Sequence, residues 1–382
     1  MWSFIVSISM VLVALTAPLM GAIADYTGWR KRFLAIYCAA GVLGTIGLGW
    51  IGAGDVLLGG LVFTIANIGF AGGNVFYNSF LVDISPQHHY GKVSGLAWGL
   101  GYLGGGLCLL LNLIMLQYPA LIGFPPGFFT VRDCMIVCGL WWGIFAIPTF
   151  LWVNPRKQII NSPSISTLLR AGWSRLYQTF GEVKKYRQLV KLLLAYLLFN
   201  DGIQTVILMA SIFGAEVVKL SAVELIGFFL LIQGTALIGS LFFGWLTGYL
   251  GNRNVLLITL IGWIIVVIWA YFIGWAYDIK TDYYIIGIIT GIVMGGSQSS
   301  ARALQASFTP AGKSAEFFGF WAMSGKFASI FGPLFYGIAI IVAGGVQAGI
   351  LVLGVFFILG GVILLTINEA KGMGIALIGR ND

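Results

Sequence analysis

Charged residues are scarce in this sequence. Only 9% of the 382 residues are Asp, Glu, Lys or Arg, whereas a soluble domain carries about 25%. The acids are the rarer class, with 13 Asp and Glu in all, and there are only two histidines, His88 and His89. A chain with so few charges lacks the polar surface of a soluble fold, so we predict a polytopic membrane protein.

The scarcity of reactive side chains excludes several classes of function. Two adjacent loop histidines cannot furnish a Ser-His-Asp arrangement, no carboxylate pair marks a hydrolase, and no Gly-x-x-x-x-Gly-Lys-Ser/Thr loop is present to bind ATP. The four cysteines fall within apolar segments and lack the spacing of metal ligands. We therefore expect a protein that is not an enzyme, uses no cofactor and holds no metal.

Hydrophobic residues are abundant instead. They make up 59% of the chain, and the mean hydropathy is +0.96. The apolar runs are long enough to cross a hydrocarbon core of about 30 Å as helices. We predict eleven spans, at 1–24, 33–53, 56–82, 93–117, 133–153, 189–213, 223–250, 255–276, 283–307, 317–342 and 346–367.

The net charge of +8 is concentrated in the loops on one side. With the first loop, which holds Arg30, Lys31 and Arg32, placed in the cytoplasm, 16 of the 21 Lys and Arg are cytoplasmic and three are outside, while Arg302 and Lys326 lie within spans. Cations stay on the cytoplasmic side of membrane proteins, so this placement is favoured. It explains the basic charge without a nucleic-acid partner, and it predicts a cell-membrane protein with a cytoplasmic C-terminus.

A central polar stretch divides the chain. We expect an N-terminal transmembrane half at 1–153, a cytoplasmic linker at 154–188, a C-terminal transmembrane half at 189–367 and a cytoplasmic tail at 368–382. In the linker, Ser162-Pro163 predicts a helix start. Apolar residues then recur at helical spacing, at Ile165, Leu168, Leu169, Trp173, Leu176, Phe180 and Val183. This helix either lies on the inner membrane surface or packs on the floor of the helix bundle.

The two hydrophobic halves repeat each other. At a shift of 223 residues the first loop recurs, because Gly21, Gly28 and Arg30 match Gly244, Gly251 and Arg253; only Asp25 loses its acid, to Gly248. At a shift of 224, Gly95 matches Gly319, Asn78 matches Arg302 and Tyr102 matches Lys326. Repeats of the same orientation predict two pseudo-symmetric halves. The span at 189–213 has no partner in the first half, so we expect the chain to begin at the second of twelve helices.

The first loop, Gly21-x-x-x-Asp25-x-x-Gly28-x-Arg30-Lys31-Arg32, resembles the signature between the second and third helices of major facilitator superfamily transporters. Five longer segments are similar to the bacterial "unknown major facilitator" group, which is related to the fungal autophagy-linked vacuolar amino-acid effluxer: 76–84, 91–106, 200–205, 295–302 and 316–329. The resemblance covers nearly all of the chain. It implies an all-α major facilitator fold of two pseudo-symmetric halves, with about eleven transmembrane helices (twelve minus the first), and the movement of small solutes, amino acids above all.

We assign a cytoplasmic gate to the first loop and its neighbours. Asp25 and Arg30 can form a charge latch with Asp83, which ends the third span on the same side of the membrane. The alternative is that these charges only signal topology. The predicted gate residues are Gly21, Asp25, Gly28, Arg30, Asp83 and Arg253.

Polar residues inside the spans indicate a cavity between the halves. An ionisable side chain at the centre of a membrane helix costs about 2.5–3.5 kcal/mol on insertion scales, so each needs a reason. We predict that the substrate and coupling cavity is lined by Asn74, Asn78, Tyr102, Asp201, Gln204, Gln298, Arg302 and Lys326. For Asp201, a structural ion pair with Lys326 or Arg302 is the alternative. For the asparagines, it is hydrogen bonding between helices.

The sequence thus predicts a secondary active transporter that moves a small polar solute, such as an amino acid, by alternating access. Proton coupling stays open, although an unpaired buried acid suits proton linkage. The expected partners are the solute, membrane lipid and, with coupling, protons, and we expect a monomer. Two alternatives remain: a non-transporting membrane sensor or scaffold derived from a carrier, and an intramembrane enzyme.

Overall fold

The computed structural model describes residues 2–52, 54–153, 164–182, 184–343 and 346–381, and every regular element among them is a helix. In chain order they are α1 (Trp2–Thr27), α2 (Arg30–Leu48), α3 (Val56–Ser79), α4 (Leu81–Ile84), η1 (Gln87–His89), α5 (Tyr90–Gln117), η2 (Pro119–Ile122), α6 (Val131–Trp152), α7 (Ile165–Gly181), α8 (Arg187–Glu216), α9 (Ala222–Leu250), α10 (Asn252–Tyr271), α11 (Ile279–Ser307), α12 (Ser314–Ala343), α13 (Val346–Leu365) and α14 (Glu369–Asn381).

Each of the eleven predicted spans corresponds to one long helix, in the order α1, α2, α3, α5, α6 and α8 to α13. The main difference concerns the first loop, because the predicted polar turn is mostly helical. Asp25 lies in the last turn of α1 and Arg30 opens α2, so only Gly28 and Trp29 connect the two helices. Gly28 has a φ of 73°, a left-handed conformation that glycine adopts without strain.

Nine helices of the described chain are long and apolar enough to cross a membrane, or ten if the bent pair α13–α14 counts as one span. Helix α11 is not among them. It carries the polar run Ser297–Arg302, and most of its side chains are buried against other helices. A helix enclosed by protein does not need the apolar surface that lipid requires, which explains why α11 is the most polar of the long helices.

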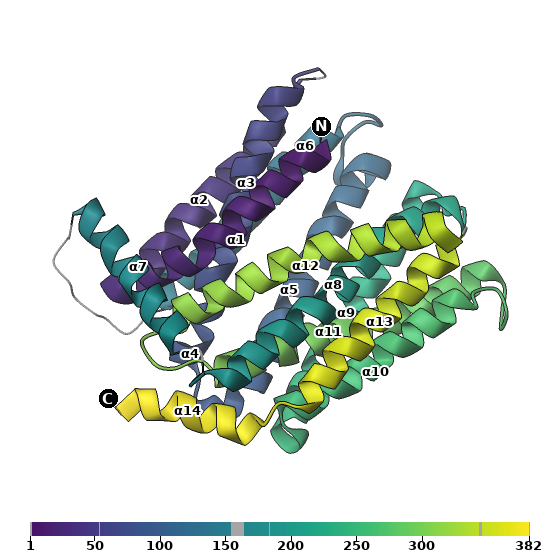
Figure 1. Cartoon of the computed structure of the whole chain (residues 1–382). Helices are drawn as coiled ribbons and strands as arrows, with labels where there is room; N and C mark the ends of the chain where they lie inside the picture. Colours follow the sequence, from purple (N-terminus) through teal and green to yellow (C-terminus); the bar gives the residue numbers. More distant parts are fainter. Residues whose placement is uncertain (1, 53, 154–163, 183, 344–345, 382) are drawn as a thin grey trace.

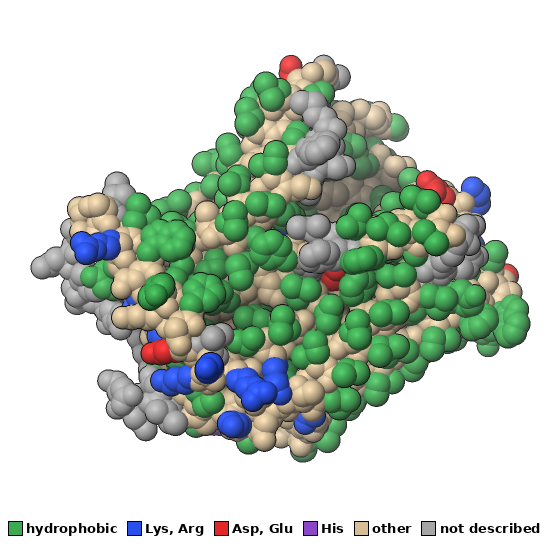
Figure 2. Space-filling view, in the orientation of Figure 1, with side chains coloured by type: hydrophobic (Ala, Val, Ile, Leu, Met, Phe, Trp, Pro, Cys, Tyr) green, Lys and Arg blue, Asp and Glu red, His purple; other side chains and the backbone are tan. Residues whose placement is uncertain are grey.

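The long helices form two groups, α1 to α6 and α8 to α13, which diverge from one end of the molecule (Figure 1). Where the groups meet, α1 packs along α12, and α5 packs along α9 and α11. Figure 2 shows that hydrophobic side chains cover much of the visible surface. Ile36, Leu43 and Ile261, for example, are more than half exposed. Such a surface suits lipid rather than water as the surrounding medium.

The two contacts between the groups are equivalent. On one side a Cβ added to Gly319 of α12 would lie 2.6 Å from the carbonyl oxygen of Ala17 in α1. On the other, a Cβ added to Gly95 of α5 would lie 2.5 Å from the carbonyl oxygen of Ser240 in α9. Gly95 and Gly319 are 224 positions apart, and Ala17 and Ser240 are 223 apart. The pseudo-symmetry predicted from the repeats is therefore confirmed.

The amphipathic helix α7 begins at Ile165, and Ser164 caps it by accepting a hydrogen bond from the Thr167 amide at 3.3 Å. The predicted start at Ser162-Pro163 and the last apolar position, Val183, lie outside the described residues. One face of α7 packs on α1, with Leu176 buried. The other face stays open, and Trp173 is 62% exposed. Packing on the bundle is thus confirmed, while the exposed face remains available to the membrane surface.

A substitution at Gly95 tests the close packing of α5 on α9. The added methyl group of Gly95→Ala would also lie 2.8 Å from the Cα of Gly244, so the two backbones would have to move apart. Overpacking of this kind costs about 1–3 kcal/mol. We expect Gly95→Ala to lower the thermal unfolding midpoint of the detergent-solubilised protein. Gly104→Ala in the same helix, where an added Cβ meets no atom within 4 Å, should not, and equal midpoints for both would contradict this packing.

Candidate functional site

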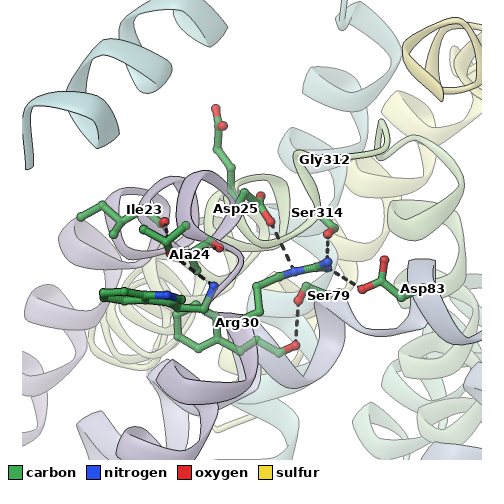
Figure 3. Close-up of polar contacts among 12 residues, drawn as sticks. Ile23, Ala24, Asp25, Arg30, Ser79, Asp83, Gly312 and Ser314 are labelled. Atoms are coloured by element: carbon green, nitrogen blue, oxygen red, sulfur yellow. Dashed lines mark hydrogen bonds and ion pairs between the residues drawn. The ribbon is translucent and has the colours of Figure 1, made fainter. Parts of the chain in front are cut away.

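The guanidinium of Arg30 is the centre of a buried polar cluster at the end where the two groups of helices meet (Figure 3). Its Nη1 donates to Oγ of Ser314 at 2.6 Å and lies 2.7 Å from Oδ2 of Asp83, while its Nε lies 3.7 Å from Oδ1 of Asp25. Only 7% of Arg30 is exposed. The contact with Asp83 is an ion pair rather than a hydrogen bond, because the N–H groups are not directed at that oxygen. We call these four residues the Arg30 cluster, and this end of the molecule the closed end.

The Arg30 cluster joins the two groups of helices through α12. Oδ2 of Asp25, in α1, accepts a hydrogen bond from the backbone N–H of Glu316 at 2.9 Å, and Ser314 is the first residue of α12. The N–H groups in the first turn of a helix have no partner within it, so a carboxylate there satisfies one of them and interacts favourably with the helix dipole. A Cβ at Gly21 would clash with the backbone of Ala315, so glycine permits this close approach.

Helix α7 adds a second layer of contacts at the closed end. Nη2 of Arg175 donates to the carbonyl oxygen of Gly312 at 2.9 Å, and its Nε lies 3.7 Å from the fully buried carboxylate of Glu316. Nζ of Lys313 donates to Oγ1 of Thr179 at 3.3 Å. The helix therefore packs on α1 and holds the segment that leads into α12. These residues were not assigned from the sequence, in which Glu316 directly precedes the predicted span 317–342 and Arg175 lies within the predicted linker helix.

Arg253, the repeat counterpart of Arg30, has different partners. Its Nε and Nη2 donate to the carbonyl oxygens of Leu364 and Leu365 at the end of α13, at 3.1 Å and 2.7 Å. Its backbone N–H donates to the carboxylate of Glu369 at the start of α14. Gly251 has a φ of 79°, close to that of Gly28, so the repeated turn is preserved. The structure thus places Arg253 within the second group of helices and outside the Arg30 cluster.

Arg302 forms a second link between the groups. Its Nε donates to Oγ of Ser94 at 2.9 Å, its Nη2 to the carbonyl oxygen of Ser94 at 2.9 Å, and its Nη1 to Oδ1 of Asn78 at 3.2 Å. The rings of Tyr77 and Trp98 lie within 5.8 Å and 5.6 Å of its guanidinium carbon, at cation–π distance. Arg302 has no carboxylate partner among the described residues, and only 5% of it is exposed. We call Asn78, Ser94 and Arg302 the Arg302 cluster.

Asn78 and Arg302 occupy equivalent positions of the two sequence repeats, and in the structure their side chains are in contact. The contact with Ser94 was missed. Ser94 Oγ also donates to the carbonyl oxygen of Ser299 at 2.8 Å, and Gln87 Nε2 donates to that of Ser307 at 3.1 Å. Three polar residues of the first group, Asn78, Gln87 and Ser94, therefore hydrogen-bond to α11 at the closed end.

Four of the predicted cavity residues are half-buried, whereas Arg302 is buried. Asn74, Gln204, Gln298 and Lys326 have no hydrogen-bond or ion-pair partner within the described part of the chain. Tyr102 stacks on Trp98 at 5.7 Å. Amide and ammonium groups without protein partners can bind water or a polar solute. They come from α3, α8, α11 and α12, and hence from both groups of helices.

Asp201 is fully buried in α8, where Oδ1 accepts a hydrogen bond from the backbone N–H of Gly332 in α12 at 2.7 Å. Among the described residues it makes no ion pair with Lys326 or Arg302, so the alternative of a structural ion pair is not realised in this conformation. Oδ2 of Asp201 and Oγ1 of Thr205, one turn further on, have no hydrogen-bond partner in the part of the chain that the structure describes. A buried carboxylate oxygen without a donor is costly unless it binds a proton or another cation.

Comparison with known protein families agrees with this architecture of two helical groups joined by charged and polar side chains. A family model described as "Vacuole effluxer Atg22 like" matches residues 1–89 and 86–376. The chain belongs to this family. Its curated relatives include the "Uncharacterized MFS-type transporter YxiO" of Bacillus subtilis (strain 168), which is 31% identical over 96% of this chain and 84% of that protein.

Fungal Atg22 proteins are more distant relatives of this Atg22-like chain. Autophagy-related protein 22-1 of Penicillium rubens is 23% identical over 87% of this chain and 69% of that protein. Solved structures share the fold at low identity. The human organic anion transporter MFSD10 has a TM-score of 0.73 and 15% identity over 94% of this chain and 82% of that one. A major facilitator transporter, FucP in the outward conformation, has a TM-score of 0.67 and 11% identity over 96% of this chain and 90% of that one.

The Atg22-like chain is therefore a multi-pass membrane transporter of the major facilitator superfamily and not an enzyme. The predicted fold class, an all-α protein of two pseudo-symmetric helical halves, is confirmed.

Removal of the Arg30 side chain should weaken the contact between the groups at the closed end. Arg30→Ala leaves Asp25 and Asp83 buried without their cation, and losing one partner of a buried pair costs about 3–5 kcal/mol. The probe is Ser299→Cys, at a fully buried position beside Ser94, in a background without the four native cysteines. We expect a water-soluble thiol reagent to label this cysteine many-fold faster in Arg30→Ala. Arg32→Ala, at an exposed position, is the matched control; equal labelling rates would argue against a latch.

Proposed function

We propose that this transporter moves a small zwitterionic solute, with an amino acid as the best-fitting class, by alternating access between the halves 1–153 and 189–367. The observation that carries the proposal is the set of half-buried polar side chains from both halves that have no protein partner in the described chain, Lys326 foremost. A carboxylate would bind the Lys326 ammonium, and the amides of Asn74, Gln204 and Gln298 would bind the other polar groups of the solute.

The kinship with proteins described as vacuole effluxers and as MFS-type transporters supports solute movement in general. The solute class rests on the side chains alone. In this proposal Arg302 belongs to the closing contacts in the present conformation and becomes available to the solute only when the Arg302 cluster opens.

We further propose that the closed end faces the cytoplasm of a cell membrane. The helix ends gathered there include the starts of α2, α5, α8, α10 and α12, together with α7 and α14. Most of the lysines and arginines are in these segments, and the positive-inside tendency supports the assignment. The present conformation would then be open toward the outside, with the gate residues Gly21, Asp25, Gly28, Arg30 and Asp83 closing the cytoplasmic end. Arg253 would fix the neighbouring end of α13.

Labelling of single cysteines tests this orientation. Thr167→Cys lies in α7 at the closed end, and Tyr277→Cys lies in the exposed connection between α10 and α11 at the opposite end. In sealed cells an impermeant thiol reagent should label Tyr277→Cys from outside, and Thr167→Cys should react only after permeabilisation. The reverse pattern would invert the orientation, and labelling of both from one side would contradict the proposed topology.

Asp201 is the proposed coupling group. It lies in the second half beside α12, the helix that also carries Lys326. Its Oδ2 has no hydrogen-bond donor among the residues that the structure describes. Protonation neutralises such a group and removes the cost of burying its charge. A proton that enters with the solute and leaves on the other side would link transport to the proton gradient.

Uptake into reconstituted vesicles tests the solute and the coupling separately. Lys326→Gln removes a charged donor, and hydrogen bonds to charged groups contribute about 1.5–3 kcal/mol, so uptake of the best amino acid should fall tenfold or more. Asp201→Asn keeps an oxygen for the Gly332 N–H but cannot titrate, so uptake should no longer respond to a pH gradient.

Matched controls are Lys92→Gln and Asp55→Asn, which change the same groups at exposed positions. Gradient-dependent uptake by Asp201→Asn would refute coupling at this site. Uptake by Lys326→Gln at the unaltered rate would refute the role of Lys326. Failure of the wild type to move any member of an amino-acid panel would refute the proposed solute class.

A further inference from the structure

A basic pocket of about 330 Å³ lies at the closed end, where α8 begins and α14 crosses beside it. Figure 2 shows Lys and Arg side chains gathered in this region. The pocket is lined by five cations, one amide and one apolar residue: Lys184, Lys185, Arg187, Gln188, Lys191, Lys371 and Ile375. Among the residues that the structure describes, no acid lines the pocket, and none of those assigned to the gate or the solute cavity belongs to it.

Hydrogen bonds hold the walls of this basic pocket in place. Oε1 of Gln188 accepts from the backbone N–H of Asn368 at 2.9 Å, and Oδ1 of Asn368 accepts from the backbone N–H of Lys371 at 2.9 Å. Nζ of Lys191 donates to the carbonyl oxygen of Thr366 at 2.8 Å. The first turns of α8 are therefore joined to the connection between α13 and α14. Arg187, Lys191 and Lys371 therefore lie on helices that are bonded to each other or to their connections, whereas Lys184 and Lys185 lie in the turn before α8.

The two acids next to the pocket residues in the sequence, Glu182 and Glu369, already have protein partners. Glu182 pairs with Lys313 at 3.7 Å and accepts a hydrogen bond from the Tyr186 hydroxyl at 3.3 Å. Burial and the Glu182 carboxylate raise the pKa of Tyr186 to about 12, so the phenol remains a donor. Glu369 accepts from the backbone N–H groups of Asn252 and Arg253. Five cations therefore line one pocket without an anion from the described part of the chain, an arrangement that an external anion would stabilise.

The helix lengths place the pocket at the level of the lipid headgroups. Helix α8 has 30 residues and is about 45 Å long, whereas the hydrocarbon core is about 30 Å thick, so its ends extend beyond the core. Helix α14 is bent by 63° from α13 and runs across this end of the bundle (Figure 1). The free N–H groups at the start of α8 add positive potential to that of the side chains.

We propose that this pocket binds the phosphate group of an anionic phospholipid from the membrane leaflet at the closed end. The phosphate would contact Arg187 and Lys371, which come from different helices, and Lys184 and Lys185 would supply further charge. Basic pockets beside transmembrane helices suit such headgroups, and a soluble phosphate has the same chemistry. A bound lipid would join α8 to the α13–α14 connection. The site is independent of the solute and of the proposed coupling.

Thermal unfolding of the full-length detergent-solubilised protein, followed by intrinsic fluorescence, tests the site. Three probes are titrated: a short-chain phosphatidylglycerol, a phosphatidylcholine of the same chain length, and inorganic phosphate. We expect phosphatidylglycerol to raise the unfolding midpoint saturably and phosphatidylcholine not to. In Arg187→Gln/Lys371→Gln the apparent Kd should rise by roughly 30-fold, on the basis of about a fivefold effect for each cation removed. Lys184→Gln/Lys185→Gln is a second pocket variant in case the first does not fold.

The matched control is Lys92→Gln/Arg170→Gln, which removes two exposed cations from the same end outside the pocket and should leave the Kd unchanged. A response to phosphatidylglycerol but not to inorganic phosphate supports a lipid as the source. A comparable response to inorganic phosphate supports the phosphate site with a soluble ligand. No saturable response to either, or the same loss of affinity in the control as in the pocket variants, would overturn the proposal.

Discussion

Two buried guanidinium groups set the conditions for the rest of this structure. Arg30 and Arg302 lie where water is excluded, and a buried cation is tolerated only while its partners remain in place. Those partners belong to both halves: Ser314 across from Arg30, and Asn78 and Ser94 across from Arg302. Separation of the halves at this end would take Ser314 from Arg30 and both Asn78 and Ser94 from Arg302. Arg30 would keep its ion pairs with Asp25 and Asp83, whereas Arg302 would lose the hydrogen-bond partners described above.

The two halves use the same backbone but different charges. Gly28 and Gly251 make the same left-handed turn, and the glycine contacts of α5 with α9 and of α12 with α1 are equivalent. Gly248 replaces the acid that would correspond to Asp25, so Arg253 has no equivalent latch partner and instead bonds to the end of α13. Glycine packing is thus duplicated on both sides of the interface, whereas the charge cluster exists on one side only.

The sequence allowed the helices to be predicted, but only some of the contacts. Apolar runs revealed the spans because lipid requires them. The contact between Asn78 and Arg302 was within reach of the repeat analysis, because residues at equivalent positions of two symmetric halves face each other near the axis. The roles of Ser94 and Glu316 could not be predicted from the repeats. They depend on the rotation of each helix about its axis and on backbone groups, which no sequence pattern reveals. Asp201 was placed near cations, yet its partner is the N–H of Gly332.

Some buried polar groups of this protein have hydrogen-bond partners and others have none among the described residues, and this difference indicates how a carrier could work. At the closed end, Arg30 and Arg302 have their partners, whereas Lys326 and three amides on helices of both halves have none in the described chain. A ligand shifts a conformational equilibrium only by its difference in affinity for the two states. In the proposed cycle, opening of the closed end costs the free energy of the contacts in the Arg30 and Arg302 clusters. The binding free energy that the solute gains from the unpartnered groups as the halves move must exceed that cost. A solute that contacted one half alone would bind equally well in both states and would not shift the equilibrium between them.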